Sequence, residues 1–220
     1  MATAVKKRWF PILAPKYFGD RLIGEVPAAE PKALIGKILT VNLFTLTDNI
    51  KRQNFEVSLV VDSVEGDAGH TSILGMRMIP TSIRRMIRKG RARLDITVMA
   101  ITKKEEAVAV KLLLITKKSV RGSVYHALNN TSRNFVSRRI ADSEFAAIAE
   151  ELVDGRLAKD LKAKVNKIYP LRSCDVRDFR LERTLKAADV RRIKQEMANI
   201  KEEPVVVEEP MPEEEVAAQA

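Results

Sequence analysis

The chain has 220 residues, and its 39 Lys and Arg outnumber 29 Asp and Glu, which gives a formal net charge of +10 at pH 7. Hydrophobic residues make up 45% of the chain, which excludes whole-chain disorder and allows a packed core. The single cysteine excludes an internal disulfide, and the two histidines lie far from it in the sequence, so no metal or other cofactor is expected.

Residues 1–31 are basic and interrupted by prolines and glycines, a composition that rarely forms regular structure on its own. We therefore expect an extended basic N-terminal arm. No apolar stretch of signal-peptide length follows its first basic residues, which favours a cytoplasmic protein. Trp9 and Phe18 can either contact a nucleic acid or pack on the core, and we expect packing for at least one of them. The arm's candidates for nucleic-acid binding are Lys6, Lys7, Arg8, Trp9, Lys16 and Arg21.

Residues 34–118 show the period-2 alternation of strands that have one buried face. In the clearest run, hydrophobic residues occupy every second position from Phe55 to Val61. Four charged residues at 103–106 separate two such runs and predict a hairpin turn. Strands are predicted, in chain order, at 37–46, 55–61, 71–79, 94–100 and 108–114.

A short helix is predicted within this β region. Thr81 or Ser82 can cap its start, and Gly90 can end it in the left-handed conformation. The basic residues around it are expected to face outward, because its apolar face is formed by Ile83, Met86 and Ile87.

Between residues 121 and 168 the apolar residues recur at helical spacing, which predicts three amphipathic helices. Gly155 and Pro170 are expected to end the second and the third. The three apolar stripes are Val124, Leu128, Thr131 and Phe135; Phe145, Ile148, Ala149 and Leu152; and Leu157, Leu161, Val165 and Ile168.

A strand at 171–183 and a final helix at 190–200 complete a single predicted α+β domain, residues 32–200. Residues 201–220 contain seven glutamates and three prolines, which predicts a disordered acidic tail. Without residues 202–220, 39 Lys and Arg face 22 Asp and Glu, a net charge of +17. So high a charge opposes compact folding by self-repulsion and indicates a polyanionic partner.

A nucleic acid and an anionic membrane surface both fit this charge, but no long apolar run or lipidation motif favours the membrane. Two segments, 77–93 and 117–139, carry thirteen basic residues and no acidic one. Arginine offers paired donors to phosphate, and Tyr125 and His126 can stack on unpaired bases, so a folded RNA is the predicted partner. The alternative is that both segments are solvated faces. The candidate RNA-binding residues are Arg84, Arg85, Arg88, Lys89, Arg91, Lys117, Lys118, Arg121, Tyr125, His126, Arg133, Arg138 and Arg139.

The sequence offers no catalytic constellation, so we expect no enzyme and no small-molecule substrate. The glycines fit no phosphate-loop spacing. Cys174 lies on a predicted strand, and we expect a buried, inert thiol rather than a nucleophile. His126 is interpreted as an RNA contact or a solvated side chain. An RNA-processing enzyme is therefore the least favoured function.

Four stretches carry a resemblance to a known family. They are Lys-Lys-Arg-Trp-Phe-Pro-Ile-Leu-Ala-Pro-Lys-Tyr-Phe at 6–18 with Ile23-Gly24; Phe55-Glu56-Val57-Ser58-Leu59; Met86-Ile87-Arg88-Lys89-Gly90 leading into Leu94-Asp95; and Ile168-Tyr169-Pro170-Leu171 with Val176-Arg177. In this order and spacing they resemble the small-subunit ribosomal protein family shared by archaea and eukaryotes, often called S-three-A-e. The size is similar to that of archaeal members, and the acidic end departs from the basic end of eukaryotic ones.

The resemblance implies a β-barrel-like antiparallel core flanked by helices. It also implies a place on the platform of the small ribosomal subunit near the messenger exit, in contact with ribosomal RNA and neighbouring ribosomal proteins. It leaves open whether messenger RNA is touched. A structural constituent of cytoplasmic ribosomes is thus the favoured function, and a free-standing RNA chaperone or translation regulator is the alternative.

Overall fold

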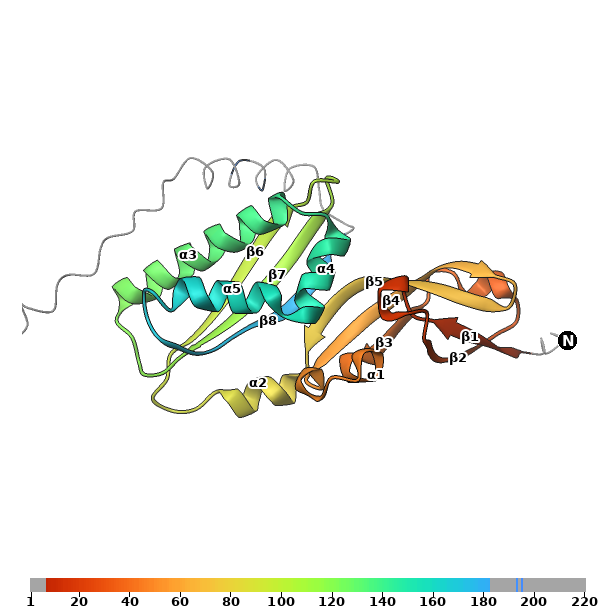
Figure 1. Ribbon diagram of the computed structural model, residues 1–220, viewed down its shortest axis with the longest axis horizontal. Helices are drawn as coiled ribbons and strands as arrows, with labels where there is room; N and C mark the ends of the chain where they lie inside the picture. Colours follow the sequence, from red (N-terminus) through yellow and green to blue (C-terminus); the bar gives the residue numbers. More distant parts are fainter. Residues whose placement is uncertain (1–6, 183–192, 194, 196–220) are drawn as a thin grey trace, which may run out of the picture.

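A computed structural model describes residues 7–182 together with Ile193 and Gln195 (Figure 1). The molecule is elongated and has two lobes. The N-terminal lobe, residues 7–79, contains five strands and one short helix: β1 (Arg8–Leu13), β2 (Leu22–Ala28), β3 (Ile38–Asn42), α1 (Leu43–Thr47), β4 (Phe55–Glu65) and β5 (Ala68–Met78). The C-terminal lobe, residues 80–182, contains α2 (Pro80–Met86), β6 (Arg93–Ile101), β7 (Ala107–Thr116), α3 (Gly122–Ala141), α4 (Phe145–Asp154), α5 (Arg156–Val165) and β8 (Leu171–Leu181).

Strand β5 joins the two lobes into one eight-stranded sheet. It pairs with β4 along one edge. On the other edge it pairs with β1 at Gly69 and His70, and with β8 from Gly75 to Arg77. The backbones of β5 and β8 approach closely at Gly75, where an added Cβ would lie 2.4 Å from the carbonyl oxygen of Phe179. Only a glycine fits this junction without displacing the backbone.

The mixed α+β class is confirmed, whereas barrel-like closure is not. In the described part of the chain, β2, β3 and β6 each pair with a single neighbour, so the sheet stays open at three edges. Helices α3, α4 and α5 cover the sheet in the C-terminal lobe (Figure 1). Because helices bury the apolar face of these strands, the lobe needs no closure of the sheet to form its core.

The expectation that residues 1–31 lack regular structure is wrong for the described part. Strands β1 and β2 form an antiparallel hairpin in which Arg8 pairs with Ala28 and Ile12 with Gly24. Phe10 and Ile12 are buried in a small second core beside the main one. An edge hairpin tolerates the prolines, because few ladder hydrogen bonds are lost there. Trp9 stays 66% exposed, but Phe18 is buried in the main core, so the expected packing of one of them is confirmed.

The strand predictions are confirmed where one face is buried. The alternate residues of β4, β6 and β7 that the pattern singled out lie in the main core, except Val61, which lies in the second core. β7 is also buried on its other face, through residues such as Leu113 and Ile115. The predicted strand 37–46 is too long. β3 ends at Asn42, whose side chain accepts a hydrogen bond from the Phe44 amide and starts α1.

Helix α2 differs from its prediction at both ends. It starts at Pro80 with Ile79 at the N-cap position, so neither Thr81 nor Ser82 caps it. Proline suits this first position because its missing N–H has no helical partner there. The helix stops at Met86, and Gly90 adopts its positive φ of 82° in the turn that follows. The basic residues at 88–89 therefore lie on a turn rather than on a helix.

The three later helices occur where the spacing predicted them, but the buried face of α3 is rotated. Its core residues are Leu128, Ser132, Val136 and Ile140, and the predicted stripe lies at the edge of this face except for Leu128. In α4 and α5 the predicted stripes are largely buried, and Gly155 ends α4 in the left-handed conformation. Ile168 lies beyond α5 and is exposed. Ile193 and Gln195 are helical, and the rest of the predicted last helix and tail lies outside the described residues.

Candidate nucleic-acid interface

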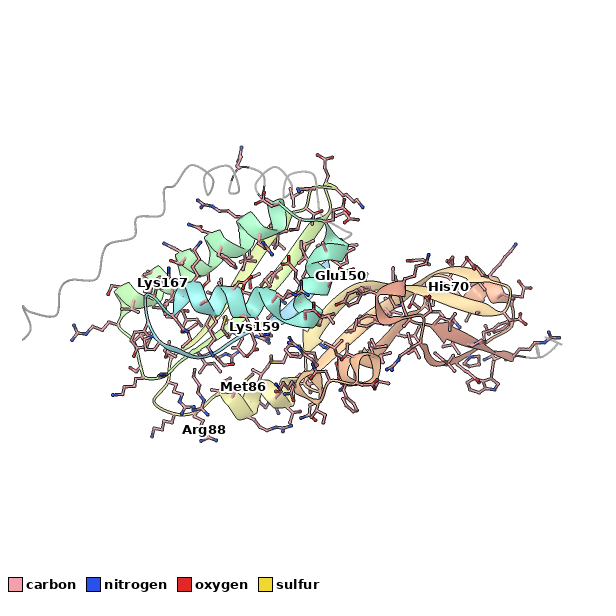
Figure 2. All side chains as sticks on the ribbon, in the orientation of Figure 1. His70, Met86, Arg88, Glu150, Lys159 and Lys167 are labelled. Carbon is pink, nitrogen blue, oxygen red and sulfur yellow. The ribbon has the colours of Figure 1, made fainter. Side chains whose placement is uncertain are left out.

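Several segments that are distant in the sequence meet at one end of the C-terminal lobe. In the antiparallel strands, Arg93 pairs with Ile115 and Thr116 with Leu171, so the loops beside these residues are neighbours. The start of α3 and the end of α5 reach the same end, where Figure 2 labels Arg88 and Lys167. We call this surface the basic end. Its twelve cations are Arg84, Arg85, Arg88, Lys89, Arg91, Lys117, Lys118, Arg121, Lys162, Lys164, Lys167 and Arg172.

Neutral contacts hold these loops together. The buried hydroxyl of Thr116 accepts a hydrogen bond from the Ala92 amide at 3.0 Å and also contacts the carbonyl of Lys118. The Lys117 amide donates to the carbonyl of Pro170. The Leu171 amide donates to the side chain of Asn166 at 2.9 Å. Because backbone and neutral groups make these tethers, most of the charged side chains at this end remain exposed.

The cations of the basic end have no carboxylate partner in the described part of the chain. Among residues 7–182, none of the twelve forms an ion pair. At the opposite end of the same lobe, by contrast, Lys104 pairs with Glu144 at 2.7 Å and Arg180 with Glu182 at 3.1 Å. One end of the lobe is thus internally compensated, and the other has an open excess of positive charge.

Arg91 lies at the centre of this excess. Its Nη1 is shielded from solvent and has no hydrogen-bond partner among the described residues. Burial lowers the pKa of Arg91, and the nearby charges of Arg172 and Arg88 lower it further. Three neighbouring arginines repel one another, and an anion bound at their exposed atoms would offset this repulsion.

Two aromatic rings stand beside these charges. Tyr125 and His126 lie in the first turns of α3, both are exposed, and their ring centroids are 6.2 Å apart in an edge-to-face arrangement. Exposed rings next to cations can stack on unpaired bases whose phosphates are held nearby. The structure therefore brings the eight predicted cations from Arg84 to Arg121 together with both predicted aromatic residues of α3 at one surface.

The remaining predicted residues lie elsewhere. Arg133 is exposed on α3, and Arg139 makes a paired contact to Glu151 at 3.0 and 2.6 Å, so its guanidinium already has a carboxylate partner. Arg138 also has contacts within the protein. Arg21 pairs with Asp48 at 2.6 Å. Lys7, Arg8 and Trp9 are exposed on the N-terminal hairpin, Lys16 is exposed on the turn between β1 and β2, and Lys6 is outside the described residues. RNA binding by these residues stays a prediction.

Sequence reasoning missed four members of the basic end, namely Lys162, Lys164, Lys167 and Arg172. A signal was present, because residues 161–174 contain these four cations and no acidic residue. The run is shorter than the two segments that stood out, and only the sheet topology places it beside Arg88 and Arg91. Two of the lysines also make internal contacts: Lys162 donates to the carbonyl of Arg172, and Lys164 lies 5.1 Å from the ring centroid of Phe135.

Other kinds of site find little support. Residues 7–182 contain no group of His, Cys, Asp and Glu that could hold a metal ion. None of the described helices is long and apolar enough to cross a membrane. The prediction of a buried Cys174 is confirmed, and burial raises the pKa of its thiol to about 12, so the reactive thiolate is scarce near neutral pH.

Comparison with known proteins gives a consistent result. The model of the Ribosomal S3Ae family matches residues 2–185. The protein named "Small ribosomal subunit protein eS1" of Methanothrix thermoacetophila is 30% identical over 171 residues, 78% of this chain and 81% of that protein. Its namesakes from Methanobrevibacter smithii and Nanoarchaeum equitans are each 28% identical, over 78% and 80% of this chain and 89% of each relative. The chain therefore belongs to the Ribosomal S3Ae family.

Proposed function

We propose that the protein is a structural component of the small ribosomal subunit that binds ribosomal RNA through its basic end. The observation that carries this proposal is the gathering of twelve cations, unpaired within the described chain, on one surface. The names of its relatives support the ribosomal setting. The phosphate groups of RNA suit such a surface, because one arginine can donate two parallel hydrogen bonds to a phosphate. The counterions that RNA releases on binding add to the affinity. The role is architectural rather than catalytic.

The finer placement that the family implies is part of the same proposal. The protein would lie on the platform of the small subunit near the messenger exit, in ribosomes of the cytoplasm, beside neighbouring ribosomal proteins. A site-directed probe can test which surface faces the RNA. Ser119, in the loop of the basic end, and Ser63, on β4, are both exposed and suit replacement by cysteine. The native Cys174 is buried and its pKa is raised to about 12, so it would take up little label.

An iron chelate attached to Ser119→Cys should cleave small-subunit ribosomal RNA at a few clustered sites in assembled subunits. The same chelate on Ser63→Cys should cleave fewer sites or different ones. Clustered cleavage on the platform would support the placement, and cleavage elsewhere would refute it. If neither probe cleaves RNA in subunits that contain the protein, the basic end does not face ribosomal RNA.

Assembly itself can be tested with a charge reversal. Arg84, Arg85, Arg88 and Lys89 are exposed, so their replacement by Glu should leave the fold intact but prevent sedimentation with small subunits. The matched control reverses four lysines outside the basic end, namely Lys32, Lys37, Lys51 and Lys103. A folded basic-end variant that still sediments normally would contradict the proposal. Wild-type protein that binds RNA but stays at the top of the gradient would favour the free-standing chaperone instead.

A further inference from the structure

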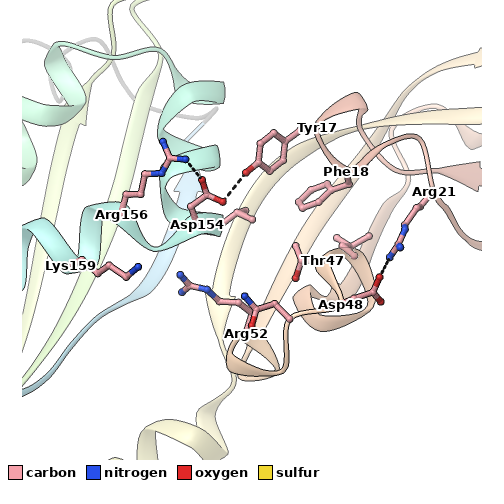
Figure 3. A pocket seen from close by; sticks show the side chains of 12 residues that line it. Tyr17, Phe18, Arg21, Thr47, Asp48, Arg52, Asp154, Arg156 and Lys159 are labelled. Carbon is pink, nitrogen blue, oxygen red and sulfur yellow. Dashed lines mark hydrogen bonds and ion pairs between the residues drawn. The ribbon is translucent and has the colours of Figure 1, made fainter.

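A cavity of about 730 Å³ lies between the two lobes, where the turn after β1, the end of α1 and the α4–α5 junction meet (Figure 3). It is separate from the basic end and was not singled out by the sequence. Its charged and aromatic lining includes Tyr17, Arg21, Asp48, Arg52, Asp154 and Lys159.

Both carboxylates of the cavity are already engaged. Asp48 pairs with Arg21 at 2.6 Å. Asp154 pairs with Arg156 at 2.9 Å and accepts a hydrogen bond from the Tyr17 hydroxyl at 3.1 Å. Each of the two carboxylates is therefore balanced by an arginine, so the acidic groups give the cavity no excess of negative charge.

Two cations of the lining have no such partner. Within residues 7–182, neither Arg52 nor Lys159 forms an ion pair. Figure 3 shows their charged ends turned toward each other across the cavity, with no carboxylate drawn between them. Two like charges that face each other repel, and an anion placed between them converts this repulsion into two attractions.

Arg52 is held in place for this role. Its guanidinium lies 5.8 Å from the ring centroid of Phe55. It also lies directly against Gly155, where an added Cβ would be 1.8 Å from its Nη2. Gly155 has a φ of 69°, so both its backbone and its missing side chain suit this position. A cation that is already ordered loses less entropy when it binds a ligand.

We propose that this cavity takes a phosphodiester group of RNA between Arg52 and Lys159, with the ring of Tyr17 beside the adjoining base. The volume lies within the range of small-molecule sites and admits a nucleotide. Tyr17 is 40% exposed, and its orientation is fixed by Asp154 on one side and by an edge contact to Phe18 at 5.1 Å. This inference deepens the proposed RNA-binding function and rests on it, but uses a different set of residues.

The continuity of charge along α5 favours RNA over an acidic protein segment. Lys159 lies in the first turn of α5, and Lys162 and Lys164 lie further along the same helix toward the basic end. Figure 2 shows Lys159 and Lys167 along this path. Ten helical residues span about 15 Å, a distance that a few nucleotides of one strand can cover. One RNA strand can therefore contact both the cavity and the basic end.

The experiment uses full-length protein and a uridine-rich single-stranded RNA of twelve nucleotides, crosslinked by ultraviolet light and mapped by mass spectrometry. Wild-type protein should give crosslinks at the peptide containing Tyr17 and at peptides of the basic end. In the double variant Arg52→Gln/Lys159→Gln, the Tyr17 crosslink should fall at least about fivefold, while the basic-end crosslinks remain. The matched control, Lys51→Gln/Lys103→Gln, removes two exposed lysines and should retain both.

A conservative variant separates the effect of lost charge from the effect of misfolding. Arg52→Lys keeps the charge and should retain most of the Tyr17 crosslink, with an unchanged circular dichroism spectrum. A Tyr17 crosslink that is absent from wild type, or that persists in the folded double variant, would overturn the cavity proposal while leaving the basic end intact. If the wild-type protein gave no crosslinks at the basic end, the proposed function would be overturned instead. Preferential capture of a poly-glutamate peptide over RNA by Arg52 and Lys159 would assign the cavity to a protein partner and overturn the inference.

Discussion

The two lobes differ sharply in what they present to solvent. Residues 7–79 contain nine Lys and Arg against eight Asp and Glu, a net charge of +1, whereas residues 80–182 contain 23 against 12, a net charge of +11. The exposed large apolar side chains show the opposite bias, because most belong to the N-terminal lobe, including Trp9, Leu22, Ile38 and Ile50. Within residues 7–182, the excess of positive charge is therefore a property of one lobe, and within that lobe mainly of one end.

The salt dependence of RNA binding should show the largest effect. If the basic end neutralises six phosphates, a plot of log affinity against log salt has a slope of about −4 to −5. Raising salt fourfold would then weaken binding by roughly several hundredfold. Filter binding or fluorescence anisotropy over a salt series measures this slope. An affinity that barely changes with salt would mean that phosphate contacts do not dominate.

Matched triple reversals sharpen the comparison between the lobes. Replacing Arg88, Arg91 and Arg172 by Glu should reduce affinity for ribosomal RNA on the order of 100-fold at low salt, because three phosphate contacts become repulsive. The same reversal of Lys7, Lys16 and Lys32 in the N-terminal lobe should cost less than about tenfold. Equal losses would break the comparison and restore the N-terminal hairpin as a principal RNA contact. Electrophoretic mobility shifts with equal protein concentrations provide the measurement.

The junction between the lobes can be broken at Gly75. The change Gly75→Ala places a methyl group against the carbonyl oxygen of Phe179 and should lower the free energy of unfolding by about 1–3 kcal/mol. Gly24→Ala is the control, since an added Cβ there meets no atom within 4 Å. Urea denaturation of both variants tests the prediction. If Gly75→Ala is as stable as Gly24→Ala, the close approach of β5 and β8 is not a constraint.

The acidic C-terminal residues should have the smallest effect. If they shield the basic surface before assembly, truncation after Lys201 should raise affinity for non-specific RNA at low salt, and the gain should fade as salt screens it. We expect a change of only a few-fold, because the truncated residues carry seven negative charges against a much larger positive excess. Equal affinities at low ionic strength would exclude shielding. As a control, circular dichroism should show that the truncated protein keeps the fold of the full-length protein.

Local patterns predicted local structure well and distant pairing poorly. The alternation from Phe55 to Val61 predicted β4 because a half-buried strand needs only its own side chains to show it. The N-terminal hairpin is an exception, because β1 and β2 are close in the sequence and pair with each other. It was missed because Pro11, Gly24 and Pro27 obscured the strand pattern, since prolines and glycines usually mark turns and loops. The basic end was half predicted because it depends on distant pairing. Its arginines at 84–91 form a dense run, whereas Arg172 joins them only through the pairing of β7 with β8.

The pairing of β5 with β8 also has a consequence for synthesis on the ribosome. Gly75 pairs with Arg180, so this edge of β5 stays unpaired until 105 more residues have been synthesised. At typical translation rates this takes roughly 5 to 20 s. Until then the edges of β5 and β7 that receive β8 are open, and open strand edges are prone to wrong pairing. The strand that closes them also brings Arg172 to the basic end. A nascent chain therefore completes its basic end and joins its two lobes in the same late folding step.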